Sequence, residues 1–183
     1  ALALTGTALL AVNKSAGTTG FQFMKMTYSA RALAMGNAFT ALSDDPDAVH
    51  FNPAGLTQIN SKQLKTNYIN YLDGMNGGSA AYVMPDLNNY NLAFFVKYLN
   101  SGDIEKTELT SKDAYVQNGT FSASNLLLGI SVAKTINENL DLGLTAKFDL
   151  EQLDDESASA VAFDLGILHQ TKNEKLKIGA SLK

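Results

Sequence analysis

The chain has 183 residues, of which 45 % are hydrophobic, so we expect one folded domain or part of a larger one. Its formal charge of −4 argues against nucleic acid as a partner. The absence of cysteine excludes disulfide frameworks, thiolate metal sites and cysteine nucleophiles. No run of about 18 apolar residues occurs, so no membrane-spanning helix is expected.

The chain begins with a short apolar run, Ala1 to Val12, whose length matches the hydrophobic region of a signal peptide. We therefore expect residues 1–16 to be the remnant of an export signal. The alternative is that these residues form the first strand or helix of the mature fold.

The segment that follows has the spacing of a helix. Apolar residues recur every three or four positions at Ala30, Leu33, Ala34, Ala38, Ala41 and Leu42. Ser29 is a suitable N-cap, and Asp44 with Asp45 closes the segment. This pattern predicts a short Ala-rich helix before the acidic pair.

Two more capped turns follow at once. Asp45 precedes Pro46, which suits the first position of a helix because its missing N–H costs nothing there. Asn52 and Pro53 repeat this arrangement just before Gly55. We therefore predict a compact group of short helices rather than one long amphipathic helix.

After Lys62 the hydrophobic period changes to two, which is typical of β-strands. Alternating runs occupy residues 92–98, 126–133, 140–150, 161–168 and 175–183. Several of these runs reach about nine to eleven residues, the length that a tilted strand needs to cross a bilayer.

The connections between these runs alternate in character. Residues 137–139 and 172–174 read as tight polar hairpin turns, whereas residues 99–121 and 151–159 read as long charged loops. Short turns at one end and long loops at the other are typical of outer-membrane barrels.

Two kinds of all-β protein fit this alternation. A soluble antiparallel sandwich also gives one apolar and one polar face per strand. We favour an antiparallel transmembrane β-barrel, because the short helices are too few to cover the apolar faces of about seven or eight strands. The opposite faces suit a wet or plugged lumen, since they carry Gly and Ser together with Lys147, Asp149, Asp164, Lys175 and Lys177. We expect the barrel to be incomplete at its C-terminal end.

Three motifs in the N-terminal part carry a family resemblance. They occupy Gly17–Phe23, Ala30–Asp45 and Phe51–Leu56, and the last reads FNPAGL. In this order they resemble the start of the PorV/PorQ proteins, a branch of the FadL-like outer-membrane barrels. The likeness continues through segments such as LLLGISVAKTI and LDLGLTAKF, and it covers almost the whole chain after residue 16.

The resemblance implies a FadL-like barrel, fourteen-stranded in the family, with an N-terminal hatch inside the lumen. Residues 17–60 would then form the hatch and residues 61–183 the barrel strands. Within the hatch motif the structural residues would be Arg31, Asp44, Asp45, Asn52, Pro53 and Gly55. Arg31 with Asp44 or Asp45 would tie the hatch to luminal charges.

The resemblance also implies a place and a role. The place is the bacterial outer membrane, with the lipid bilayer as surroundings. The role is that of PorV-type barrels in type IX protein secretion, where secretion-system subunits and secreted cargo are the partners. The alternative is FadL-like transport of hydrophobic small molecules, with a hydrophobic compound or lipid as ligand.

Residues that would indicate an enzyme are scarce. Only His50 and His169 are present, and both are expected to be structural or exposed. Residues 44–47 lack the spacing of an EF-hand, and the acids of residues 151–157 read as a solvated rim. No phosphate-binding loop or nucleophile elbow occurs, so we expect neither enzymatic activity nor a metal or cofactor.

Overall fold

The computed structural model describes residues 20–71, 73–109, 115–171 and 176–183. The predicted signal remnant, the turn at residues 172–174 and Lys175 lie outside these residues. The helical elements are η1 (Gln22–Lys25), α1 (Ala30–Ala34), α2 (Ala48–Phe51) and η2 (Pro53–Gln58). The strands are β1 (Gln63–Asn70), β2 (Asn76–Leu87), β3 (Tyr90–Asn100), β4 (Ile104–Leu109), β5 (Tyr115–Phe121), β6 (Ala123–Asn137), β7 (Leu140–Leu153), β8 (Glu156–Gln170) and β9 (Lys177–Leu182).

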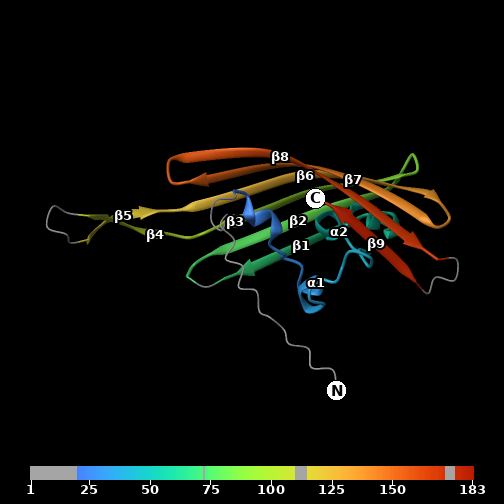
Figure 1. Ribbon diagram of the computed structural model, residues 1–183, viewed down its shortest axis with the longest axis horizontal. Helices are drawn as coiled ribbons and strands as arrows, with labels where there is room; N and C mark the ends of the chain where they lie inside the picture. The colour runs from blue at the N-terminus through green and yellow to red at the C-terminus, as the bar shows by residue number, and fades with distance from the viewer. Residues whose placement is uncertain (1–19, 72, 110–114, 172–175) are drawn as a thin grey trace, which may run out of the picture.

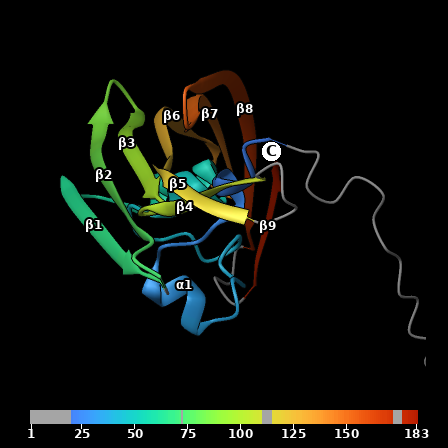
Figure 2. The same ribbon diagram turned by 90° about the vertical axis from the view of Figure 1, so that its left-hand side faces the viewer.

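The fold is all-β, and its main sheet is a curled half-barrel. Seven antiparallel strands follow the order β1-β2-β3-β6-β7-β8-β9, so neighbours in the sheet are also neighbours in sequence apart from the step from β3 to β6. Figure 2 shows the sheet curving around the N-terminal helical elements, with β1 and β9 at its two edges. The all-β barrel class with an N-terminal helical segment, predicted from the sequence, is therefore confirmed.

The concave face of the sheet holds the core. Residues 20–60, which we call the hatch segment, lie on this face (Figure 2). The main cluster of buried side chains joins Phe23, Val49 and Leu56 of the hatch segment to wall residues such as Val83 and Leu127. The side chains of the convex face stay exposed, which is the arrangement that the alternation predicted.

Among the described residues, no helix combines the length and the apolar character that crossing a membrane requires.

The helix predicted after Ser29 is shorter than its apolar spacing indicated. The Ser29 hydroxyl does cap α1, since it accepts a hydrogen bond from the Ala32 amide at 3.3 Å. The helix ends at Ala34, and Gly36 and Asn37 follow with φ angles of 62° and 63°. This left-handed pair turns the chain, so the apolar spacing beyond it belongs to turns and not to a helix.

Both predicted long loops are wrong as loops. Residues 99–121 contain the β4–β5 hairpin, which forms a separate two-stranded sheet beyond the end of the main sheet (Figure 1). In residues 151–159 the strands β7 and β8 continue until only Asp154 and Asp155 separate them. In both places the side chains are exposed on both faces, so no apolar period marked the strands.

Candidate functional site

The turn that begins at Asn52 fixes the hatch segment to the wall. The Asn52 side chain is buried, and its Oδ1 accepts the Ala54 amide at 3.1 Å, as an N-cap before Pro53. Its Nδ2 donates to the carbonyl oxygens of Thr40 and Ile167, each at 2.9 Å. One side chain therefore joins two parts of the hatch segment to β8.

Three glycines on the concave face, which we call the glycine seat, lie against this turn and the nearby Thr40. A Cβ atom at Gly143 would lie 2.3 Å from the Ala54 amide nitrogen, and one at Gly166 would lie 2.2 Å from Asn52 Oδ1. On β9, a Cβ at Gly179 would lie 2.5 Å from the Thr40 carbonyl oxygen. Only glycine leaves room for the hatch segment at these positions.

Gly55 has the same role within the hatch segment. A Cβ atom there would lie 2.1 Å from the carbonyl oxygen of Ser43. Pro53 and Gly55 are both buried, so both contribute to close packing. From the sequence the wall glycines were assigned only to the face of a wet or plugged lumen, and their close contact with the hatch segment was not predicted. The signal that could have found them is the recurrence of glycine at concave-face positions of consecutive strands.

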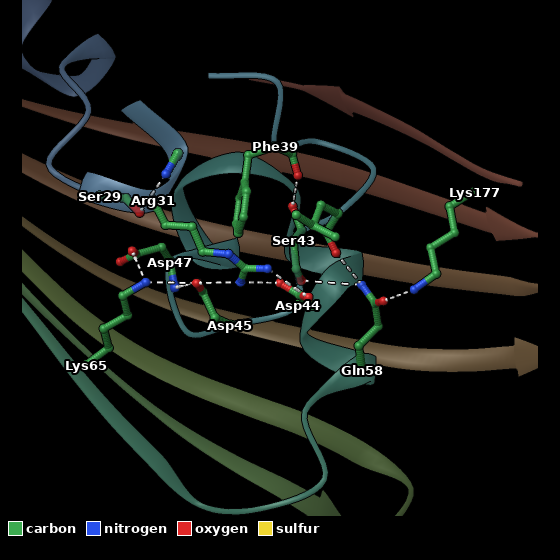
Figure 3. A network of polar contacts seen from close by, with 12 residues as sticks. Ser29, Arg31, Phe39, Ser43, Asp44, Asp45, Asp47, Gln58, Lys65 and Lys177 are labelled. Atoms are coloured by element: carbon green, nitrogen blue, oxygen red, sulfur yellow. Dashed lines mark hydrogen bonds and ion pairs between the residues drawn. The ribbon is translucent and has the colours of Figure 1, made fainter. Parts of the chain in front are cut away.

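Charged residues hold the outer part of the hatch segment together (Figure 3). Arg31 lies 2.6 Å from Asp44 and 3.1 Å from Asp45, so the structure brings together the three charged residues singled out in the motif. These bonds, to Asp44 first and then to Asp45, raise the pKa of the Arg31 guanidinium. The pair is largely exposed, and exposed ion pairs contribute about 0–1 kcal/mol.

The link from these charges to the wall runs through Lys65 of β1. The Lys65 ammonium lies 2.8 Å from Asp45 and 2.6 Å from Asp47, whose side chain is buried. Asp47 also accepts a hydrogen bond from Asn67 Nδ2 at 2.9 Å. Arg31 therefore stays within the hatch segment, while Asp45 and Asp47 connect that segment to an edge strand.

On the opposite side of the seat, Gln58 makes a second link. Its Nε2 donates to the Leu42 carbonyl at 2.8 Å, and its Oε1 accepts from Lys177 of β9 at 2.6 Å (Figure 3). The hatch segment is thus bound to both edge strands of the sheet.

A buried lysine of β3 holds the start of the hatch segment. The Lys97 ammonium donates to the carbonyl oxygens of Phe23 at 2.9 Å and Met26 at 2.5 Å. It also lies 4.8 Å from the ring centroids of Phe23 and Tyr28, at cation–π distance. Backbone oxygens and aromatic rings thus surround the Lys97 ammonium, and the main role of this side chain is to hold η1 against the wall.

A cavity of about 460 Å³ lies between η1 and the wall. Its apolar lining includes Phe21, Met24, Met26, Tyr28, Phe51 and Ala162. Its charged lining includes Lys25, Lys97, Lys147, Asp164 and Lys183. Lys147 forms a buried ion pair with Asp164, and the Lys183 ammonium donates to the His50 carbonyl at 2.6 Å. The cavity therefore offers an apolar interior with cationic groups at its wall.

His50 faces the same cavity. Its Nε2 is shielded from solvent and has no hydrogen-bond partner among the described residues. Burial, together with the charges of Lys97, Lys147 and Lys183, lowers the pKa of the His50 imidazole to about 3. His50 is neutral at physiological pH, and its role is packing against the Phe95 ring, whose centroid lies 5.0 Å away.

In the part of the chain that the structure describes, no three His, Asp or Glu side chains gather closely enough to hold a metal ion. The residues around the cavity serve packing, hydrogen bonding and ion pairing. The site is thus a helical segment packed against the concave face of the sheet, with an adjoining amphipathic cavity.

No protein-family model matches the sequence, and no curated protein matches it either.

Proposed function

We propose that this chain forms part of an outer-membrane β-barrel of the PorV/PorQ type, which serves type IX secretion by binding secreted cargo and secretion-system subunits. The observation that carries the proposal is the exposed apolar face of the sheet. This convex face points away from the hatch segment, whereas the concave face, which carries apolar, small and charged side chains, surrounds that segment.

The outer face of β7 has the height of a bilayer core. Six apolar side chains follow one another at Leu140, Leu142, Leu144, Ala146, Phe148 and Leu150. Ten residue steps at about 3.3 Å give a length of about 33 Å, and a strand tilt of about 40° reduces this to a height of about 25 Å. The next residues in this every-second-residue series, Gln152 and Asp154, are polar, so the apolar band ends at Leu150.

The band continues around the sheet. Exposed apolar residues on the neighbouring strands include Phe94, Leu126, Leu128, Ile130, Val161, Phe163, Leu165 and Ile167. Among the described residues no second sheet and no helix covers this face, since the hatch segment occupies the other one. In water such a surface would drive aggregation, whereas in lipid it needs no cover. A soluble sandwich would bury these side chains, so this arrangement favours the barrel.

A barrel in lipid must also be closed. Backbone groups at an unpaired strand edge find no partner in hydrocarbon. Within the described residues β1 and β9 are both edges, so closure would require further strands. The fourteen strands implied by the family resemblance would provide them, and the hatch segment would then lie inside the closed lumen.

The secretion role is supported by the motif series and tested by its partners. A tagged copy of the protein, expressed in a bacterium with a type IX secretion system, is expected to recover translocon subunits and secreted cargo from detergent-solubilised membranes. The control is a copy with the Ala-rich segment scrambled and its composition kept. Recovery of neither partner class by the native protein would contradict the secretion role.

A second candidate function, transport of hydrophobic small molecules, is favoured by the cavity beside η1. Its apolar lining and cationic wall fit an amphiphile with an anionic headgroup. The test is calorimetric titration with dodecanoate. An Ala162→Trp variant fills the cavity and should abolish binding, whereas Ala158→Trp on the same face of β8 should not. Equal binding by both variants would exclude the cavity as the site.

A further inference from the structure

The β4–β5 hairpin is a ribbon that stands apart from the barrel wall. It forms its own two-stranded sheet and projects along the long axis, past the end of the main sheet (Figure 1). Within the described residues neither outer edge of the ribbon pairs with a further strand. Unpaired strand edges present rows of backbone donors and acceptors to any extended chain that approaches them.

The ribbon has no core of its own. Residues 103–108 and 115–120 are exposed on both faces, and the exposed apolar side chains include Ile104 at 39 %, Tyr115 at 77 % and Val116 at 50 %. A two-stranded hairpin with no layer over it is at best marginally stable in water. A third strand along one edge would add backbone hydrogen bonds and cover part of these side chains.

The charge of the ribbon is predominantly negative. Asp103, Glu105 and Glu108 are exposed, and the one nearby cation described in the ribbon, Lys106, is paired with Asp154 at 2.9 Å. That pair connects the ribbon to the turn between β7 and β8. Two further carboxylates lie next to this pair, at Asp155 of the turn and at Glu156, the first residue of β8. The surface therefore favours a partner with positive charge.

We infer that the β4–β5 ribbon binds an extended, basic segment of a partner polypeptide by strand addition. The open edge supplies backbone pairing, the exposed Tyr115 and Val116 supply apolar contact, and the carboxylates select lysine or arginine side chains. The inference rests on the proposed function only in that an outer-membrane location would leave the ribbon beyond the end of the barrel wall, away from the lipid. The binding itself depends only on the ribbon and on the adjoining turn between β7 and β8.

The mode of binding distinguishes an extended peptide from a cation or a folded basic surface. A cation or a basic surface would need the carboxylates but no free backbone edge. An extended peptide needs both, so blocking its backbone amides must weaken binding even when its charge is unchanged.

The probe is a fluorescent octapeptide of alternating lysine with valine or threonine, titrated by anisotropy against the detergent-solubilised protein. An analogue that is N-methylated at alternate residues keeps the charge but cannot pair along one edge, and we expect its Kd to be at least tenfold weaker. A peptide with glutamate in place of lysine should bind at least tenfold more weakly too.

Protein variants complete the test. The double variant Glu105→Lys/Glu108→Lys should weaken binding of the basic peptide at least tenfold. The control Glu138→Lys, in the exposed turn between β6 and β7, should leave the Kd unchanged. Equal binding of the N-methylated and native peptides would show that charge alone acts, and absence of saturable binding would also overturn the inference. Neither result would affect insertion of the barrel into lipid, which is measured separately.

Discussion

Asn52 of the hatch segment donates a hydrogen bond to the carbonyl of Ile167, a residue 115 positions later in β8. The same amide group also bonds Thr40, so one buried side chain fixes the hatch segment to the wall. This relationship explains why the turn requires asparagine and not simply any residue that caps a helix. An aspartate would retain the cap at Ala54 but could not donate to either carbonyl.

We predict that Asn52→Asp destabilises the protein by about 3 kcal/mol or more. Two buried carbonyls lose their donor, and a carboxylate replaces a neutral amide in a buried position. The measurement is urea unfolding in detergent micelles followed by circular dichroism. Asn60→Asp, at an exposed position of the hatch segment, is the control and should change stability by less than about 0.5 kcal/mol. Equal effects of the two substitutions would refute this role of Asn52.

The glycine seat gives a second prediction. In Gly166→Ala the new methyl group would meet Asn52 Oδ1 at 2.2 Å, so the hatch segment must move. Overpacking of this kind costs about 1–3 kcal/mol, and we expect faster proteolysis of residues 20–60. Gly20→Ala is the control, because its methyl group would lie at an ordinary 3.7 Å from Glu151. Unchanged proteolysis in Gly166→Ala would mean that the seat is not tightly packed.

The ion pair between Lys65 and Asp47 gives a third prediction. Lys65→Met removes the cation beside a buried carboxylate and should cost about 3 kcal/mol, since it leaves Asp47 without its ion pair. The double variant Lys65→Met/Asp47→Asn should recover much of this loss. Arg31→Gln, in the exposed pair with Asp44, should cost less than about 1 kcal/mol. Unfolding midpoints in urea test this order, and a larger effect of Arg31→Gln would contradict it.

His50 should make stability depend on pH. Its pKa is about 3 in the folded protein and about 6.5 in an unfolded chain, so the unfolded state binds the proton more readily. The free energy of unfolding therefore does not depend on this group above about pH 6.5, and it decreases as the pH falls from there toward 3. Because the ring is only partly enclosed, we expect a loss of about 1–3 kcal/mol.

The variant His50→Asn tests this dependence. Unfolding free energies measured at pH 7.5 and pH 4.5 should differ less in His50→Asn than in the native protein. His169→Asn, at an exposed position of β8, should keep the native difference. An identical pH dependence in the native protein and in His50→Asn would show that other groups cause it.

The sequence was sufficient to predict those strands that have one apolar face. In β7 and β8 the alternation follows the contrast between exposed and hatch-facing positions, so it marks the strand and its orientation together. The caps at Ser29 and Asn52 were also predicted correctly, because a capping side chain acts within a few residues of its own position.

What the sequence did not predict depends on contacts between distant segments or on uniform exposure. The ribbon strands β4 and β5 are exposed on both faces, so they show no apolar period. The wall glycines read as small polar-face residues, because the hatch turn that excludes a side chain lies about a hundred residues away in sequence. Gly36 and Asn37 end α1 through left-handed backbone, while the apolar spacing continues past them.

We expect the convex face of the sheet to contact lipid, and single-tryptophan fluorescence can measure this contact because the native chain has no tryptophan. Phe148→Trp and Phe163→Trp place the probe on the apolar band, and Tyr115→Trp places it on the projecting ribbon. In vesicles of bromine-labelled phosphatidylcholine, we predict strong quenching and blue-shifted emission for Trp at positions 148 and 163, with neither at position 115. Unquenched, red-shifted emission at positions 148 and 163 in the folded protein would show that the convex face does not contact lipid.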